Sequence, residues 1–210
     1  MMWWGQVLQG FDTVTIIFYA VIAYIIGSIP SGLIIGKVCY GKDLRLYGSK
    51  NTGATNAYRL LGFKAAFSVF LCDAIKGAIG AWLFAPVPPL MVFGGLVAML
   101  GHNCSVFLKF KGGRGVATGL GIVIYLAPYV SLICMVLWGL IVYFTRIVSL
   151  GSIIVAILTP ILMFLFGESL WIVGFGVFGA LFVVIRHKAN IVRLLHGTEL
   201  KVDRLPGVKK

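Results

Sequence analysis

The chain has 210 residues, of which 60% are hydrophobic and only 11% are charged, and its mean hydropathy is +1.02. These values exclude an ordinary water-soluble domain and indicate an integral membrane protein whose outer surface faces lipid. The formal net charge of +12 would suit a nucleic-acid partner only on a compact basic module, which the sequence lacks, so we expect no nucleic-acid binding.

The apolar segments predict an all-α fold, a polytopic membrane helical bundle with about seven transmembrane helices. A helix needs about 20 apolar residues to cross a bilayer. By this measure we expect spans near residues 14–39, 60–85, 90–108, 115–128, 129–145, 147–166 and 169–186. Residues 115–145 leave an alternative open, because they could form one overlong helix instead of a tight hairpin bent at Pro128 and Tyr129. No repeat divides the sequence, so a single domain is expected over residues 1–210.

The basic residues favour seven spans and predict an orientation. With seven spans, one side of the membrane carries 16 of the 18 Lys and Arg residues, in segment 40–64, in the loop 109–114, at Arg146 and in the tail from Arg186. By the positive-inside rule this side is cytoplasmic. Residues 1–13 are then extracytoplasmic, and residues 187–210 form a cytoplasmic tail.

Other residues carry structural expectations. The first 13 residues contain no Lys or Arg, and no A-x-A cleavage site follows, so the first apolar segment is expected to remain as a span. Pro30 is expected to kink that span. Asp73 and Lys76, spaced i, i+3, are expected to form an ion pair, and His102 is either a hydrogen-bonded structural residue or a site residue. The cysteines are expected to be buried free thiols, at Cys39, Cys72, Cys104 and Cys134.

Three polar segments on the basic side supply the candidate site. In the first, residues 41–62, the turn residues Gly48 and Ser49 precede Arg59 on the following helix. Hydroxyls and amides between them favour an anion-binding turn, at Ser49, Asn51, Thr52, Thr55 and Asn56. The alternative is a solvated loop with a helix N-cap.

The second segment, Lys109–Gly121, is both cationic and glycine-rich. Its glycines are expected to direct backbone N–H groups at an anion in front of a helix start, at Gly112, Gly113 and Gly115. Lys109, Lys111 and Arg114 add positive potential. Attraction to lipid headgroups, or a purely structural role of the glycines, are the alternatives.

The third segment begins at Arg186 and places His187 and Asn190 on one helical face, so both can approach a common ligand. Other reaction classes are poorly supported. The chain has only six Asp and Glu residues and no acidic cluster on the basic side, so no metal and no other cofactor is expected. There is no G-x-S-x-G elbow, and no histidine is followed by the aspartate of an H-x4-D pair.

Four ordered motifs resemble those of the bacterial acyl-phosphate:glycerol-3-phosphate acyltransferases, and they read GSIPSGLIIGK, GSKNTGATNAYRLLG, GHNCSVFLKFKGGRGVATGLG and RHKANIVRLLHG. The resemblance extends over about residues 20–200. It implies a seven-span protein of the bacterial inner or plasma membrane that acts in phospholipid synthesis. Its reaction would transfer a fatty acyl group from acyl phosphate to the 1-hydroxyl of glycerol 3-phosphate, giving 1-acylglycerol 3-phosphate (lysophosphatidate) and phosphate.

The resemblance also implies roles for individual residues. Ser49, Arg59 and Arg114 would hold phosphate groups, helped by the backbone of Gly112, Gly113 and Gly115. His187, Asn190 and Ser49 are the candidate catalytic residues, with His187 and Asn190 beside the glycerol moiety. Three positions depart from the family pattern, since Lys50, Ser105 and Arg114 stand where the family commonly has Gly, Pro and Lys.

Direct attack of the hydroxyl on the activated acyl group is the expected mechanism, without a covalent acyl-enzyme. His187 and a substrate phosphate oxygen are both candidates for the general base. The alternative function is a membrane transporter of phosphate or a phosphorylated metabolite, although the cations crowd one face and not the midplane where transporter sites usually form.

Overall fold

The computed structural model describes residues 10–202, which are helical with no strand. The outermost part of the predicted extracytoplasmic end, residues 1–9, and the last part of the predicted tail, residues 203–210, lie outside this range. The longer helices are α2 (Thr13–Ser28), α5 (Phe63–Trp82), α6 (Pro88–Asn103), α7 (Val116–Leu126), α8 (Pro128–Thr145), α9 (Val148–Leu165) and α10 (Leu170–Arg186). Shorter helices are α3 (Ser31–Ile34), the π-helix η1 (Ile35–Cys39), the 3-10 helices η2 (Leu44–Leu46) and η3 (Val106–Leu108), α4 (Ala54–Leu61) and α11 (Lys188–Leu195).

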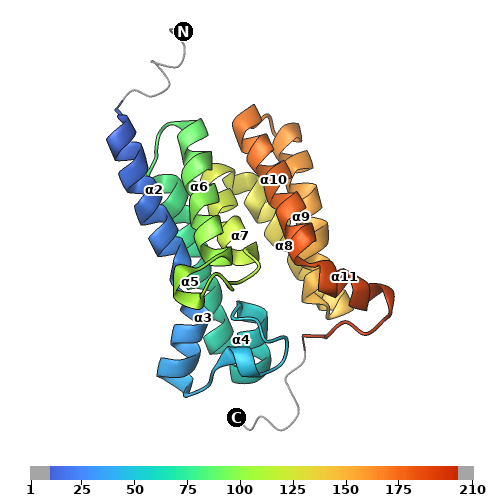
Figure 1. The fold of residues 1–210 in the computed structure, drawn as a ribbon. Coiled ribbons are helices and arrows are strands. Elements are labelled where there is room, and N and C mark those ends of the chain that lie inside the picture. Colours follow the sequence, from blue (N-terminus) through green and yellow to red (C-terminus); the bar gives the residue numbers. More distant parts are fainter. Residues whose placement is uncertain (1–9, 203–210) are drawn as a thin grey trace.

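The long helices form a bundle, with α2, α5 and α6 on one side and α8, α9 and α10 on the other (Figure 1). Helix α7 lies between these two groups. The start of α2 is at one end of the bundle, whereas α4 and α11 both lie at the opposite end. The short helices that carry the predicted site segments therefore gather at one end of the molecule.

The predicted membrane character is confirmed, while the count of seven crossings stays a prediction. Within residues 10–202, five helices are long and apolar enough to span a bilayer, and α10 with α11 makes a sixth if that bent pair counts as one span. Helix α7 is apolar but has only 11 residues. At 1.5 Å per residue it extends roughly 16 Å, about half of a bilayer core.

The alternative of one overlong helix over residues 115–145 is wrong. Helix α7 ends at Leu126 and α8 starts at Pro128, with Ala127 in a non-helical conformation (φ −145°, ψ 72°). The physical reason is Pro128, which has no N–H to donate and disfavours the helical conformation in the residue before it.

Two further breaks shape the predicted spans. The first span is interrupted at Ile29 and Pro30, between α2 and α3, as expected from the proline. The second begins at Phe63 and not at residue 60, because Gly62 adopts φ 90°, which separates α4 from α5. Both breaks lie toward the end of the bundle that carries the site segments.

Small residues set the close approach of α5 and α7. A Cβ on Gly77 would collide with the backbone of Thr118, and one on Gly121 would collide with the backbone of Ala74. Membrane helices commonly use glycine in this way to let backbones touch. The contact fixes α7 against α5, and with it the loop from which α7 starts.

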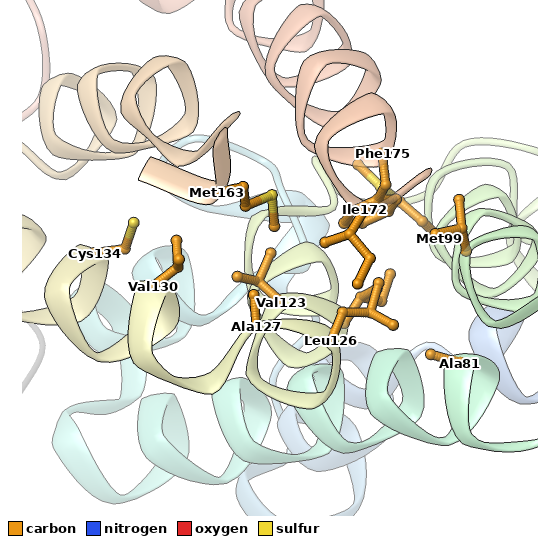
Figure 2. Packing of buried hydrophobic residues seen from close by; sticks show 12 residues of the cluster. Ala81, Met99, Val123, Leu126, Ala127, Val130, Cys134, Met163, Ile172 and Phe175 are labelled. Carbon is orange, nitrogen blue, oxygen red and sulfur yellow. The ribbon is translucent and has the colours of Figure 1, made fainter. Parts of the chain in front are cut away.

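The largest apolar cluster surrounds the break between α7 and α8 (Figure 2). Val123 and Leu126 of α7 and Val130 of α8 are buried there. They pack with Met163 of α9 and Phe175 of α10. The cluster joins the two sides of the bundle, while Leu44, Ala57 and Leu60 of the first site segment pack in a second, separate cluster.

The expectation of buried free thiols is only partly right. All four cysteines are free, but only Cys134 is buried, while Cys39 and Cys72 are exposed and Cys104 is intermediate. The apolar run around each cysteine does not distinguish a core position from a lipid-facing one, and this explains the error. The predicted ion pair is confirmed, with 2.7 Å between Lys76 Nζ and Asp73 Oδ1.

Candidate active site

Asn56 organises the first site segment. Its buried side chain amide donates hydrogen bonds to the carbonyls of Leu44, Tyr47 and Asn51, and its Oδ1 accepts the backbone N–H of Ser49 at 3.1 Å. The sequence suggested Asn56 as a group that could meet an anion. The structure instead uses its amide to hold the turn that carries Ser49, which is half-buried like Thr52 and Thr55.

Glu199 is the centre of the third segment. Its Oε1 accepts hydrogen bonds from the Ser149 hydroxyl at 2.8 Å and from the Asn190 amide, and its Oε2 accepts from Arg193 Nε at 2.7 Å. Burial opposes ionisation, but the hydrogen bonds from Asn190, Arg193 and Ser149 outweigh it and lower the pKa of Glu199 below its ordinary value. Glu199 is thus an ionised carboxylate that fixes Asn190. It belongs to residues 198–202, which we call the C-terminal strap.

The strap reaches across to the first segment. Arg59 donates from Nε to the carbonyl of Lys201 at 3.0 Å and from Nη2 to that of Leu200 at 2.8 Å. The Val202 N–H donates to the carbonyl of Arg146, in the turn between α8 and α9, at 2.8 Å. These bonds hold the Arg59 guanidinium in one plane. They also place the basic turn at Arg146 on the same face as the tail, as the charge pattern predicts.

The second segment folds differently from the predicted phosphate cradle. The N–H groups of Gly112 and Gly113 donate to the carbonyls of Asn103 and His102, each at 3.0 Å. They serve the loop itself and do not point at a ligand. Gly115, with φ 80°, forms the N-cap of α7. The N–H groups available to an anion are therefore those of the first turn of α7, which have no intrahelical acceptor.

Arg186 joins the second segment to the third. At the end of α10 its Nη2 donates to the carbonyl of Gly113 at 2.8 Å. All four basic regions of the sequence are thus brought to one face of the protein. Loop 109–115 is held by α6 from one side and by α10 from the other.

Arg114 lies within the field of this cluster. Burial lowers the pKa of its guanidinium, Glu199 raises it, and the neighbouring charges of Arg193, Arg59 and Arg186 lower it further. An arginine stays charged near neutral pH despite such a shift. Four guanidinium groups with one carboxylate give a cationic site, which suits a ligand that carries more than one negative charge.

His187 is buried at the junction of α10 and α11, which meet at a bend of 62°. Its Nδ1 lies 2.8 Å from the carbonyl of Val183. Because a carbonyl only accepts, the proton sits on Nδ1 and Nε2 is left as an acceptor. Burial and the nearby Arg114 lower the pKa of His187, against the Val183 hydrogen bond and Glu199, which raise it. The imidazole is therefore neutral at pH 7.

No metal centre emerges from the described part of the chain. Among residues 10–202 there is no group of three or more His, Cys, Asp and Glu side chains that could hold a metal ion. Arg59, Arg114, His187 and Asn190 are brought together around Glu199, while Ser49 is tied through Asn56 to the helix that carries Arg59. The chemistry available is anion binding, hydrogen bonding to a hydroxyl, and stabilisation of negative charge.

Comparison with known proteins supports a single assignment. Residues 17–197 match the family model described as glycerol-3-phosphate acyltransferase. The chain belongs to this family. A glycerol-3-phosphate acyltransferase of Fusobacterium nucleatum is 47% identical over 186 residues, which cover 87% of this chain and 96% of the relative. A Bacillus subtilis relative is 40% identical over 189 residues, which cover 88% of this chain and 96% of the relative.

The fold agrees with this assignment. The crystal structure of PlsY, an integral membrane glycerol 3-phosphate acyltransferase, in its glycerol 3-phosphate form superposes with a TM-score of 0.83 at 38% identity. The alignment covers 89% of this chain and 94% of PlsY. A second PlsY structure, the lysophosphatidic acid form, superposes with a TM-score of 0.81 at 36% identity. The protein is thus an integral membrane member of the glycerol-3-phosphate acyltransferase family.

Three residues of the candidate site have no role predicted from the sequence, namely Ser149, Arg193 and Glu199. Ser149 begins a span 50 positions before Glu199, so no spacing rule links them. Arg193 stands in the third polar segment, but its sequence position assigns it no role beyond a positive charge. The available signal was Glu199 itself, because it is one of only six acidic residues and stands in a strongly basic tail.

Proposed function

We propose that this acyltransferase uses acyl phosphate as its donor. A fatty acyl group passes to the 1-hydroxyl of glycerol 3-phosphate, and the products are 1-acylglycerol 3-phosphate (lysophosphatidate) and inorganic phosphate. The observation that carries the proposal is the convergence of Arg59 and Arg114 with His187 and Asn190 at one end of the bundle. Family membership favours acyl transfer over the alternative of a transporter.

The phosphate groups are assigned to the cationic part of the site. Arg114, just before α7, offers paired N–H donors to phosphate oxygens. Arg59, whose Nε and Nη2 donate to the carbonyls of the strap, contributes its positive charge. Ser49 adds a hydroxyl beside α4. The first turn of α7, capped by Gly115, contributes backbone N–H groups and the positive end of the helix dipole.

The reaction needs no covalent enzyme intermediate. The glycerol hydroxyl oxygen attacks the acyl carbonyl carbon, a new C–O ester bond forms, and the C–O bond to the phosphate breaks. The leaving phosphate departs with the bonding pair, and Arg114 stabilises the charge that develops on it. Positioning and charge stabilisation are sufficient because the acyl group is already activated in the donor.

His187 is assigned to orienting the glycerol hydroxyl. Its Nε2 is an acceptor, since Nδ1–H is held by Val183. Full transfer of the hydroxyl proton to His187 would create an imidazolium in a buried site beside Arg114, which is unfavourable. We therefore assign the proton to an oxygen of the departing phosphate. Asn190, fixed by Glu199, hydrogen-bonds the glycerol moiety.

The proposal is tested with purified protein in detergent, given palmitoyl phosphate and labelled glycerol 3-phosphate. The expected result is labelled lysophosphatidate, with one phosphate released for each product. Palmitoyl-CoA replaces the acyl phosphate in a parallel reaction. Product from palmitoyl-CoA and none from palmitoyl phosphate would overturn the donor assignment, while anion flux in liposomes without any product would favour transport.

The site is proposed to face the cytoplasm, in a protein that sits in the bacterial inner or plasma membrane as a single domain. The support is the basic face formed by segments 40–64, 109–114, Arg146 and the tail, together with the positive-inside rule. A fluorescent reporter fused to the C-terminus should be bright in cells. An alkaline phosphatase fusion at the same place should be inactive, and the reverse result would invert the topology.

A further inference from the structure

A buried ion pair lies directly behind the candidate site. Asp73 and Lys76 of α5 are 3% and 5% exposed, and Lys76 Nζ lies 2.7 Å from Asp73 Oδ1. Lys76 Nζ also donates to the carbonyl of Ile29 at 2.9 Å. On the other side, His102 Nδ1 of α6 lies 3.7 Å from the same Asp73 oxygen. The pair therefore touches the break between α2 and α3 as well as the end of α6.

The contact at Ile29 leads to the first site segment. Three residues after Ile29, Gly32 packs on the backbone of Thr52 so tightly that a Cβ would collide with the Thr52 carbonyl. Thr52 belongs to the turn that carries Ser49 and leads into the helix of Arg59. A displacement of the α2–α3 break by loss of the Lys76 hydrogen bond would be transmitted to this turn.

The contact at His102 leads to the second site segment. Its imidazole packs against Gly113, where a Cβ would collide with the ring, and its carbonyl accepts the Gly113 N–H at 3.0 Å. Arg114 is the next residue in the chain. The ring position, set beside Asp73, therefore sets the position of the loop that carries Arg114.

The two contacts meet around one small, partly open pocket. A polar cavity of about 10 Å³ is lined by Thr52 from the first segment, Gly113 from the second, and Asp73, Lys76 and His102 between them. It has room for about one water molecule. No substrate fits there, so the cluster acts on the reaction through the segments that it supports.

We propose that Asp73 and Lys76 are positioning residues, which set the separation between the Ser49–Arg59 segment and the Arg114 loop. This rests on the proposed function, because it takes those two segments as the phosphate-binding groups. The competing explanation is that the pair contributes only to stability. The two are distinguishable because a buried ion pair can often be replaced by apolar side chains of similar size with little loss of stability.

The test is the double variant Asp73→Leu/Lys76→Met, which removes both charges together and leaves neither unpaired. Its Tm in detergent is expected to stay within about 3 °C of the wild type. Its KM for glycerol 3-phosphate should nevertheless rise about tenfold or more, because small misplacement of binding groups is costly in catalysis. The measurement is steady-state kinetics with palmitoyl phosphate, together with thermal unfolding.

The matched control is Cys134→Ala/Thr159→Val, which removes a buried polar contact of 3.4 Å between α8 and α9. This control should leave the KM for glycerol 3-phosphate unchanged. A double variant of Asp73 and Lys76 that folds with wild-type KM and kcat would overturn the proposal. Equal rises in KM for the two double variants would also overturn it, because the effect would then be general loosening.

If the double variant does not fold, the single variant Lys76→Met tests the same role. Lys76→Met keeps Asp73 and removes the hydrogen bond to the carbonyl of Ile29. It should raise the KM for glycerol 3-phosphate, and Lys76→Arg should restore part of the loss. Failure of the proposed function gives a different result, because the wild type itself would then form no product from palmitoyl phosphate.

Discussion

Two buried carboxylates within residues 10–202, Asp73 and Glu199, are paired in different ways. Glu199 receives hydrogen bonds from Asn190 and Arg193, which lie on α11, and from Ser149 in the first turn of α9. Asp73 meets a lysine one turn along its own helix. Glu199 therefore joins groups that are far apart in the chain, whereas Asp73 is paired with a neighbour on its own helix.

The difference shows how a chain with six acidic residues uses each of them. A buried charge must be paired or it destabilises the fold. Around Glu199 the partners are themselves site groups, so pairing the charge also assembles the site. Around Asp73 the partner is a span residue, so pairing keeps a charge tolerable within the membrane. Removal of Glu199 should therefore have the larger effect.

Glu199→Ala should cause the largest loss. Its removal leaves the donors of Ser149, Asn190 and Arg193 without their acceptor, at a cost of about 2 kcal/mol in the free energy of unfolding. It also releases the strap that orients Arg59, so activity should fall by about 100-fold or more. Glu168→Ala, in the turn between α9 and α10, is the control and should be close to wild type. Wild-type kcat/KM in Glu199→Ala would show that the strap does not assemble the site.

Arg114→Ala should come next, with a loss of activity but not of folding. Removing a group that stabilises developing charge typically costs about 100-fold or more in kcat. Arg114 is partly exposed in a loop, so Tm should change little. Arg114→Lys should keep part of the activity, since it retains the charge but not the paired donors. The control is Lys188→Ala, an exposed cation beside His187. Equal activity losses for Arg114→Ala and Lys188→Ala would indicate that only net charge matters.

Part of the fold and of the candidate site can be predicted from the sequence. The helical membrane fold follows from the apolar runs, and the local pair of Asp73 and Lys76 follows from i, i+3 spacing. Arg114 and His187 stand out because charge, glycine and histidine interrupt apolar sequence. Each of these signals lies within one or two helical turns of the chain.

What the sequence could not show depends on contacts between distant segments. Glu199 bonds to Ser149 across 50 positions, and Arg59 meets the Lys201 carbonyl across 142. The Gly112 and Gly113 N–H groups looked available because nothing local accepts them. Their acceptors lie at the end of α6, and only the folded loop brings them together.

The pH dependence of Tm tests whether His187 is neutral in the folded protein. We expect this effect to be smaller than those of Glu199→Ala and Arg114→Ala. The folded pKa lies below the ordinary value of 6.5, so the unfolded state binds more protons as pH falls. Stability contributed by the neutral ring is therefore complete above pH 6.5 and is lost as pH falls below it. Tm should decline below pH 6.5 in the wild type and decline less in His187→Gln.

Activity provides the second measurement on the same variant. If His187 only orients the hydroxyl, His187→Gln should keep measurable turnover, and the wild-type rate should stay flat as pH falls toward 6.5. A wild-type rate that rises with an ordinary histidine pKa, and is abolished in His187→Gln at all pH values, would make His187 the general base.

Glu199 contributes to stability over a different pH range. Because its pKa is lowered in the folded state, the stability that its carboxylate contributes is lost only as pH falls below about 4.5.

Asp43→Asn should change Tm and kcat/KM least, because Asp43 is paired with exposed side chains and not with buried ones. Hydrogen bonds from Arg45 hold the pKa of Asp43 well below its usual range, and Lys37 lies 3.3 Å away. The partner side chains are 47% and 52% exposed, so water screens these charges. Exposed ion pairs contribute about 0–1 kcal/mol, so Tm should fall by no more than about 3 °C and kcat/KM by less than about twofold. A larger loss of activity would mean that the turn after η1 helps to place Ser49, because solvent screening leaves the ion pair itself too weak to explain it.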